Sequence, residues 1–133
     1  MLARFFAPTI DVSAHCDLPC GVYDPAQARI EAESIKAIIG KLADNDDPDF
    51  RTRAIIIKEQ RAELVKHHLW VLWTDYFKPP HFEKYPQLHT LFNEATKLAG
   101  ATGVKGSVDA AKADELLAKI DEIDKIFFET KQA

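Results

Sequence analysis

Apolar residues recur at helical spacing along four stretches of this chain, and no stretch alternates convincingly between apolar and polar residues as a strand does. The first stretch has four aliphatic side chains at positions i, i+3, i+4 and i+7 of one helical face: Ile35, Ile38, Ile39 and Leu42. Asp24-Pro25 and Asp47-Pro48 each combine an N-cap residue with a proline that suits the first helical position. These signals predict an all-α fold.

The first two helices are bounded by start and stop signals. We expect the first to run from Asp24-Pro25 until residues 43–47 interrupt it, and the second to run from Asp47-Pro48 to Phe77. The second helix carries a stripe that we expect to face the interior, with these members: Phe50, Ala54, Ile57, Arg61, Leu64, His68, Leu72 and Tyr76.

Two further helices complete the pattern. Pro86 predicts the start of a third helix that ends at Gly100, and Ser107 predicts the N-cap of a fourth helix after a glycine-rich loop. The expected inward side chains are Leu88, Leu91, Phe92, Ala95 and Leu98 on the third helix, and Val108, Ala111, Leu117, Ile120, Ile123 and Phe127 on the fourth. Four amphipathic helices with such loops predict an antiparallel four-helix bundle over residues 24–133.

Charge and hydropathy restrict the partners of this chain. Its 133 residues carry a formal net charge of −4 and are 47% hydrophobic, which is enough for the core of one domain. A negative balance argues against nucleic acid as a partner, and no apolar run approaches the length that spans a membrane. The same balance means that an anionic substrate must be attracted by local positive charge.

The segment from His15 to Cys20, with the sequence HCDLPC, contains the only two cysteines of the chain. If the chain is cut before His15, the free α-amine and the backbone nitrogen of Cys16 close a five-membered ring around a metal ion. The same nitrogen and the Cys16 thiolate close a second ring, and Cys20 returns across the turn to the fourth position. The His15 imidazole can then reach an axial site. The segment therefore predicts a metal-binding hook.

The donor set of this hook favours one metal. Four planar donors of mixed nitrogen and sulfur character suit nickel or copper and argue against tetrahedral zinc. Because two thiolates tend to reduce Cu(II), nickel is the better choice. We expect loading to weaken as the pH falls, since every ligand must lose a proton. Without metal, we expect Cys16 and Cys20 to form a disulfide.

Longer strings around the hook resemble one known family. The string HCDLPCGVYDPAQARIEAESIKAI, from His15 to Ile38, closely resembles the start of mature nickel-containing superoxide dismutase. Three further strings resemble the same family: IKEQRAELVKHHL (57–69), DYFKPPHFEKYPQLH (75–89) and IDKIFFETK (123–131). The resemblance covers residues 15–133 almost without a break. It implies an enzyme that converts superoxide to dioxygen and hydrogen peroxide by cycling one nickel ion per subunit between Ni(II) and Ni(III).

The resemblance also implies how the chain is processed and assembled. Residues 1–14 would be a pro-segment that a dedicated protease removes in the cytoplasm, leaving the hook at residues 15–23. The chemical reason is that the amide nitrogen of an intact Ala14–His15 bond cannot replace a basic amine as a metal donor. The mature chain, residues 15–133, would form a homohexamer of four-helix bundles.

Several site residues follow from the same resemblance. Asp17 and Tyr23 would border the open face of the metal and limit access to a small diatomic anion. Leu18-Pro19 would be a cis peptide that closes the hook, and such bonds are largely confined to tight X–Pro turns. Glu31 and Arg61 would hold the axial imidazole through hydrogen bonding.

Tyr76 would pair with Tyr23, and Lys78 would supply local positive charge for superoxide. Each of these residues has a structural alternative, because most polar side chains belong to the surface or the scaffold. Glu31 could be a solvated helix acid, and Arg61 could belong to a structural ion pair. The remaining histidines are interpreted as structural or solvated: His67, His68, His81 and His89.

Two other functions compete with the dismutase. A nickel or copper chaperone or sensor would bind an exchangeable metal at the hook without turnover. A helical interaction module with a redox-active cysteine pair would be indifferent to the residue that precedes His15.

Overall fold

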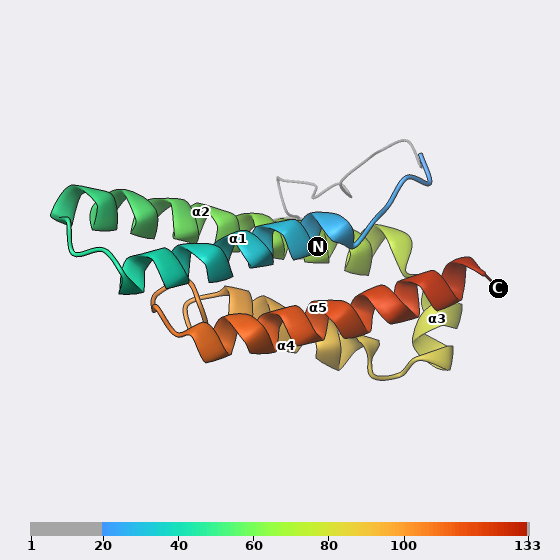
Figure 1. Cartoon of the computed structure of the whole chain (residues 1–133). Coiled ribbons are helices and arrows are strands. Elements are labelled where there is room, and N and C mark those ends of the chain that lie inside the picture. Colours follow the sequence, from blue (N-terminus) through green and yellow to red (C-terminus); the bar gives the residue numbers. More distant parts are fainter. Residues whose placement is uncertain (1–19, 133) are drawn as a thin grey trace, which may run out of the picture.

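The computed structural model describes residues 20–132, which form five α-helices and one π-helical turn, with no strand among them (Figure 1). The helices are α1 (Ala26–Ala43), α2 (Pro48–Val71), α3 (Pro79–Lys84), α4 (Leu88–Ala99) and α5 (Ala110–Lys131), and the π-helical turn η1 (Leu72–Tyr76) directly continues α2. No helix in this part of the chain is both long and apolar enough to cross a membrane. The predicted all-α fold is confirmed.

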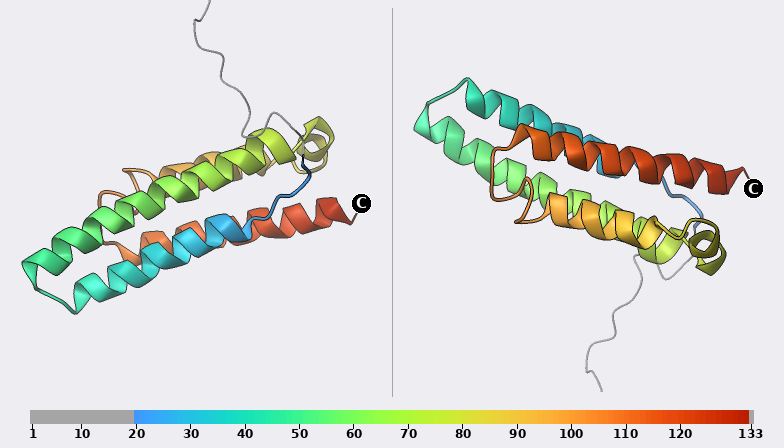
Figure 2. Two further views of the ribbon diagram at one scale, coloured as in Figure 1. Left: turned by 90° about the horizontal axis from the view of Figure 1, so that it is seen from above. Right: turned by 90° about the horizontal axis from the view of Figure 1, so that it is seen from below.

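The four long helices form an antiparallel bundle, as predicted. Helix α1 packs against α2 and α5, and α4 packs against the same two helices, so the four close into a ring. Successive long helices run in opposite directions, and two further views show them lying along a common axis (Figure 2). The chain at residue 20, helix α3 and the end of α5 all lie at one end of the bundle (Figure 1).

Both Asp-Pro start signals are confirmed to within one residue. The Asp47 carboxylate accepts a hydrogen bond from the Phe50 N–H at 2.7 Å, with Pro48 as the first residue of α2. At α1 the Asp24 carboxylate accepts from the Ala26 N–H at 2.8 Å, so the helix begins directly after Pro25. These caps satisfy backbone donors that the first helical turn leaves unpaired.

The core is formed by one face of each long helix. On α4, every side chain that was predicted to point inward is buried. The core of α1 and α5 is made by these side chains: Ala28, Ala32, Ile35, Ile39 and Leu42 from α1, and Ala113, Leu116, Ile120, Ile123, Ile126 and Phe127 from α5. Residue Ile38, which was also predicted to face inward, is only half-buried.

The predicted start of the last helix is wrong. Its cap is Asp109, whose carboxylate accepts from the Ala111 N–H at 2.9 Å, whereas the Ser107 hydroxyl donates to the Gly103 carbonyl at 2.6 Å. Because the helix begins two residues later than a Ser107 cap implies, Val108 and Ala111 are exposed and do not join the core.

The connection between the second and fourth helices also differs from the prediction. The chain leaves α-helical geometry after Val71 and continues through η1, and α3 then begins at Pro79-Pro80. Prolines fit there because the first helical turn has no use for their missing N–H groups. Helix α4 begins at Leu88 and not at Pro86. The wider π turn rotates the side chains of η1 relative to those of α2.

The buried face of α2 lies about one residue away from the predicted stripe. Its buried members are Ala54, Lys58, Ala62, Val65 and Leu69, while Leu64 of the predicted stripe is exposed. The physical reason is Lys58, a charged residue at a core position, which hides the true face from an analysis of hydropathy.

Lys58 is only 1% exposed and ties α2 to the loop between α4 and α5. Its ammonium donates to the carbonyl oxygens of Val104 at 2.5 Å, Lys105 at 2.8 Å and Ser107. Burial lowers the pKa of Lys58 below its ordinary value of 10.5, because the charged form loses hydration. The three carbonyl oxygens take the place of the water that the ammonium has lost.

We predict that Lys58→Met lowers the free energy of unfolding by about 2–3 kcal/mol, because it leaves one buried and two partly buried carbonyl oxygens without a charged donor. The unfolded chain binds the Lys58 proton more tightly than the folded chain. The Lys58 contribution therefore rises with pH between its lowered pKa and 10.5, and this rise should vanish in the variant. Urea unfolding across that pH range measures both effects.

Lys66→Met is the matched control on the same helix, since Lys66 makes a surface ion pair with Glu63 at 2.9 Å. It should cost less than about 1 kcal/mol. Equal losses in the two variants would show that the loop does not depend on Lys58.

Candidate metal centre

The hook lies mostly outside the described residues. His15, Cys16, Asp17 and the Leu18-Pro19 bond precede residue 20, so their predicted roles and the predicted cis peptide are not covered by the structure. Cys20 is the first residue described, and it is exposed. Among residues 20–132, no three His, Cys, Asp or Glu side chains gather in a way that could hold a metal ion. Of the predicted ligands, the structure therefore places Cys20 alone.

The chain runs without regular structure between Cys20 and α1. Gly21 has a φ of +71°, a left-handed conformation that glycine adopts without steric cost. Tyr23 follows half-buried against the core, and Asp24 caps α1. The packed tyrosine and the helix cap fix the point at which the hook leaves the bundle.

A hollow of about 130 Å³ opens beside Cys20. Its walls come from the segment that joins the hook to α1, the first turn of α1, the end of α2 and the start of η1: Cys20, Val22, Tyr23, Asp24, Gln27, His68, Val71 and Leu72. A liquid water molecule takes about 30 Å³, so the hollow has room for a diatomic molecule with a few waters.

Two polar side chains that line this hollow, Gln27 and His68, were given no role in the site from the sequence alone. His68 lies on the predicted stripe of α2 together with Arg61 and Tyr76, and that shared face was the signal that could have indicated it. Gln27 carries no comparable signal, because its position depends on how the first turn of α1 meets α2.

Tyr23 and Tyr76 are brought together, with their ring centroids 5.7 Å apart. Tyr76 also packs on Phe127 of α5, at a centroid distance of 4.3 Å, and its hydroxyl lies 2.8 Å from the Thr130 hydroxyl. The Lys131 ammonium donates to the Tyr23 carbonyl oxygen at 3.4 Å. The end of α5 therefore supports both tyrosines, a contribution that the sequence analysis did not predict.

Glu31 on α1 and Arg61 on α2 form an ion pair across the two helices. One guanidinium nitrogen of Arg61 donates to both Glu31 carboxylate oxygens, at 3.0 and 3.3 Å. The Glu31 side chain is 13% exposed and that of Arg61 is 42% exposed, so the pair holds a largely shielded carboxylate in a fixed orientation. Such a carboxylate can accept a hydrogen bond from an imidazole N–H.

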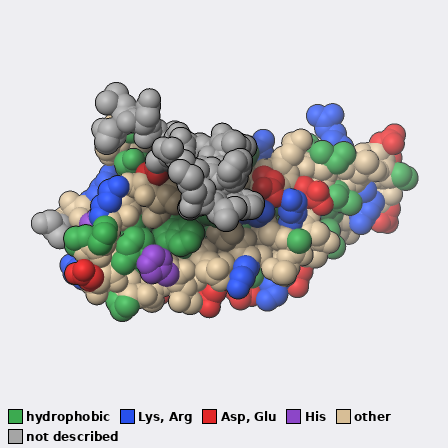
Figure 3. Space-filling view, turned by 180° about the vertical axis from the view of Figure 1, so that it is seen from behind, with side chains coloured by type: hydrophobic (Ala, Val, Ile, Leu, Met, Phe, Trp, Pro, Cys, Tyr) green, Lys and Arg blue, Asp and Glu red, His purple; other side chains and the backbone are tan. Residues whose placement is uncertain are grey.

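Single lysine side chains supply positive charge near this end of the bundle. Lys78 precedes α3 and is exposed, and within the described residues its ammonium has no ion-pair partner, while its backbone N–H donates to His81 Nδ1 at 3.1 Å. Over the face shown in Figure 3, acidic and basic side chains are interspersed and are not segregated by sign. Lys78 follows Tyr76 by two residues and Lys131 contacts the Tyr23 carbonyl oxygen, so both are positive groups close to the tyrosine pair in sequence or in space.

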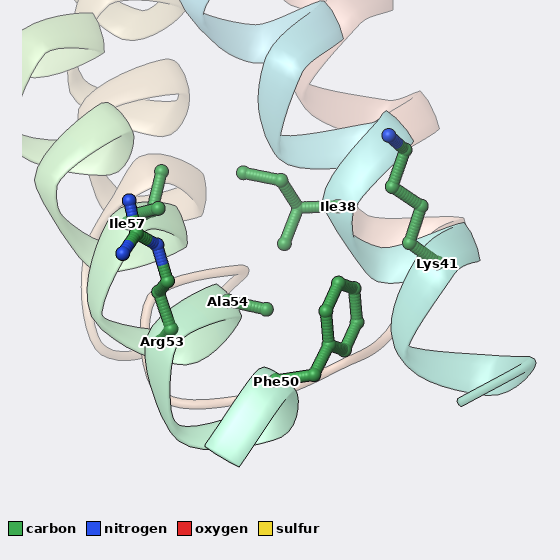
Figure 4. A pocket seen from close by; sticks show the side chains of 6 residues that line it. All are labelled: Ile38, Lys41, Phe50, Arg53, Ala54 and Ile57. Atoms are coloured by element: carbon green, nitrogen blue, oxygen red, sulfur yellow. The ribbon is translucent and has the colours of Figure 1, made fainter. Parts of the chain in front are cut away.

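A larger hollow of about 260 Å³ lies between α1 and α2, towards the loop that joins them. Ile38 and Phe50 point into it from the two helices, and Lys41 and Arg53 stand at its edge (Figure 4). It is almost wholly apolar, and none of the residues predicted to act on a metal or on superoxide lines it. The smaller hollow beside Cys20 is therefore the candidate metal centre.

The donor chemistry of this centre fits nickel. The exposed Cys20 thiol stands at the edge of a small hollow, and the residues directly before it supply a second thiol and an imidazole. Soft thiolate and nitrogen donors suit a late transition metal, whereas calcium and magnesium prefer oxygen ligands.

The comparisons with known proteins agree with this chemistry. Residues 10–131 match the family model of nickel-containing superoxide dismutase. The chain is 67% identical to nickel superoxide dismutase from Streptomyces coelicolor and 68% identical to that from Streptomyces seoulensis, in both cases over the full length of both chains. A solved native structure of nickel superoxide dismutase superposes with a TM-score of 0.85 at 67% identity, covering 90% of this chain and 100% of that chain.

The likeness thus extends over nearly the whole sequence and over the fold. With the HCDLPC segment and the tyrosine pair behind it, it shows that the chain belongs to the family of nickel-containing superoxide dismutases.

Proposed function

We propose that this chain is a superoxide dismutase that uses nickel, held by His15, Cys16 and Cys20 after the chain is cut before His15. It converts two superoxide ions and two protons to one dioxygen and one hydrogen peroxide. The observation that carries the proposal is the position of Cys20, which ends the HCDLPC segment beside a small hollow that is walled by Tyr23.

Three residues of the hook would bind the metal. The α-amine and imidazole of His15, the backbone nitrogen and thiolate of Cys16, and the Cys20 thiolate supply the donors. Bound nickel supplies one-electron chemistry between Ni(II) and Ni(III), which strongly donating thiolates and an anionic backbone nitrogen make accessible. The same donors must be deprotonated, so the enzyme loses its metal as the pH falls.

The other site residues act on access and orientation. Asp17 and Tyr23 border the metal and admit only a small anion, and Tyr76 supports the Tyr23 ring from behind. The Glu31 carboxylate, fixed by Arg61, orients the His15 imidazole. Lys78 attracts superoxide locally, which matters because the net charge of −4 does not.

Residues 1–14 are removed on maturation by a protease in the cytoplasm, and residues 15–133 form the enzyme. The lengths of similar proteins support this cut. The solved native dismutase is covered completely by 90% of this chain, so about 13 of the 133 residues have no counterpart there. A pro-segment of 14 residues accounts for that difference.

The mature chain assembles as a homohexamer. Large apolar side chains remain exposed on the single chain and support self-association: Val22, Ile30, Ile56, Trp70, Trp73 and Phe128. Analytical ultracentrifugation of residues 15–133 tests the assembly, and a sedimentation coefficient typical of a monomer would contradict it.

Superoxide decay after pulse radiolysis tests the activity. Nickel-loaded residues 15–133 should remove superoxide catalytically, and zinc-loaded protein should not, because zinc has no redox chemistry. Bound nickel without turnover would instead indicate a chaperone or sensor.

The proposed role of Arg61 gives a further prediction. Arg61→Met should lower the dismutation rate by about tenfold, because Glu31 loses the partner that orients it. It should change the free energy of unfolding by less than about 1 kcal/mol, since the pair is partly exposed. Pulse radiolysis and thermal unfolding of the same sample measure the two effects.

Lys36→Met is the matched control, because it breaks another α1 ion pair, with Asp114 of α5 at 2.6 Å, that does not touch the site. It should leave dismutation unchanged. An Arg61→Met enzyme with full activity would assign Arg61 to the scaffold alone.

A further inference from the structure

Helix α3 has no buried residue, and two histidine side chains connect it to η1. At its start, the Lys78 backbone N–H donates to His81 Nδ1 at 3.1 Å. In its middle, the Phe82 ring stacks on the imidazole of His89 from α4, with the ring centroids 4.1 Å apart. His89 Nδ1 in turn accepts from the Trp73 indole N–H of η1 at 3.0 Å. Because little apolar area is buried here, such polar contacts decide how firmly α3 is held.

The direction of both hydrogen bonds is fixed by their donors. A backbone N–H and an indole N–H can only donate, so Nδ1 of each imidazole must be the acceptor. An imidazole that accepts at Nδ1 is neutral and carries its proton on Nε2, whereas a protonated imidazole has an N–H at both ring nitrogens and accepts nothing. Both bonds therefore exist only while His81 and His89 are neutral. The stack of Phe82 on His89 needs no acceptor and does not depend on that charge.

The His81 ring also contacts the tyrosine pair. It stacks on Tyr76, with centroids 5.8 Å apart and planes 20° apart, and it meets the buried Phe77 ring edge to face at 5.8 Å. Tyr76 packs on Tyr23, which lines the hollow of the candidate metal centre. One imidazole thus joins the backbone of Lys78 to the rings behind that hollow.

Few charged groups accompany the two imidazoles. Within residues 20–132, neither His81 nor His89 forms an ion pair. The titratable groups beside them are the Tyr76 phenol, which stacks on His81, and the Glu83 carboxylate, which lines the same hollow as His89. The Lys78 side chain precedes His81 by three residues. No ion pair therefore holds either imidazole in its charged form.

We propose that His81 and His89 are positioning residues that hold Lys78 and the start of α3 beside η1 while both imidazoles are neutral, and that protonation of the imidazoles releases them. Imidazoles ordinarily gain their second proton between about pH 8 and pH 5, so acidification over this range breaks both hydrogen bonds. At the other end of α3, the Tyr85 hydroxyl donates to the Glu129 carboxylate of α5 at 2.9 Å, a contact that uses no imidazole. The start of α3 therefore loosens while its end stays attached.

Amide hydrogen exchange of nickel-loaded residues 15–133, followed by mass spectrometry at about pH 7.5 and pH 5.5, tests the release. The Lys78 amide can be read by itself, because the two prolines that follow it carry no N–H. After correction for the intrinsic effect of pH, this amide should exchange about three- to tenfold faster at the lower pH, as expected for the loss of one hydrogen bond. Core amides of α5 should keep their protection at both pH values.

Asparagine variants separate the charge of the imidazole from its contacts. The asparagine amide oxygen can take the place of Nδ1 and accepts a hydrogen bond without titrating. The double variant His81→Asn, His89→Asn should therefore keep the Lys78 amide protected at both pH values, and any loss of nickel at low pH affects it as it affects the wild type. His81→Leu removes the acceptor and should expose the amide at both pH values.

His67→Asn is the matched control, because it removes an exposed imidazole of α2 and should leave the response to pH unchanged. Equal protection of the wild-type Lys78 amide at the two pH values would overturn the proposal. A response to pH that survives in the double asparagine variant, or disappears in His67→Asn, would overturn it as well.

The consequence for activity rests on the proposed function, in which Lys78 attracts superoxide. At neutral pH, Lys78→Met should lower the second-order rate constant of dismutation about three- to tenfold and weaken its dependence on ionic strength, and His81→Leu should do the same to a smaller extent. The double variant should equal Lys78→Met alone, because His81 acts through Lys78. Additive losses would overturn this link. If the nickel-loaded wild type shows no dismutation, the proposed function fails, and hydrogen exchange still decides whether the imidazoles hold α3.

Discussion

A chain that keeps Ala14 in front of His15 should lose superoxide dismutation by about a hundredfold or more relative to residues 15–133. The reason is chemical. In the longer chain the His15 nitrogen is an amide, which has no basic lone pair and donates to a metal only after losing a proton that it holds tightly. One of the nitrogen donors would then be missing, and the hook would bind and stabilise the metal less strongly. The loss corresponds to about 2.7 kcal/mol or more of transition-state stabilisation.

The measurement compares residues 14–133 with residues 15–133 after identical nickel loading, with metal content determined for both. A third chain with His15 replaced, His15→Ala, keeps a free amine in the same place and removes only the imidazole. It should retain tight nickel binding and lose part of the activity. Equal dismutation by the chains that start at residue 14 and residue 15 would rule out the amine as an essential donor.

The parts of the fold that the sequence predicted are those that local chemistry decides. Asp47 followed by Pro48 combines a helix N-cap with a residue that suits the first helical position, and α2 begins there. The inward face of α4 follows from a regular apolar period that no charged residue interrupts. Asp109 and Ser107 are both acceptable caps, so the choice between them depended on packing that a sequence does not show.

Features that depend on distant contacts could not be predicted. From the sequence alone, Lys58 is expected at the surface. In the fold, its ammonium is surrounded by three carbonyl oxygens of a loop more than forty residues away. The π-helical turn η1 has no local signature either. It presents Tyr76 to Tyr23 on one side and to α5 on the other.

The residues of the candidate site also fall into those that the sequence indicated and those that only the fold reveals. The resemblance supplied the residue pairs whose members lie far apart in the sequence, and the structure brings both pairs together: Tyr23 with Tyr76, and Glu31 with Arg61. It did not supply Thr130, because the contact of that residue with the Tyr76 hydroxyl depends on how α5 packs against η1.

Cys20→Ser should remove both the metal and the activity while leaving the fold intact. A serine hydroxyl is a hard donor that holds its proton at neutral pH, so we expect nickel affinity to fall by about a hundredfold or more and dismutation to become undetectable. Cys20 is exposed and precedes α1, so the free energy of unfolding of the metal-free protein should change by less than about 0.5 kcal/mol. Competition with a chelator measures affinity, and urea unfolding measures stability.

A comparison of the variants Cys16→Ser and Cys20→Ser, singly and together, tests whether both thiolates bind the same nickel ion. If the two thiolates serve one nickel ion, each variant alone should lose nearly all the activity, and the double variant should lose little more, because the residues act as a unit. Independent, additive losses would mean that the two cysteines act at separate places. A Cys20→Ser protein that keeps nickel and full activity would show that the hollow beside Tyr23 takes no part in the mechanism, since Cys20 is the proposed ligand that lines this hollow.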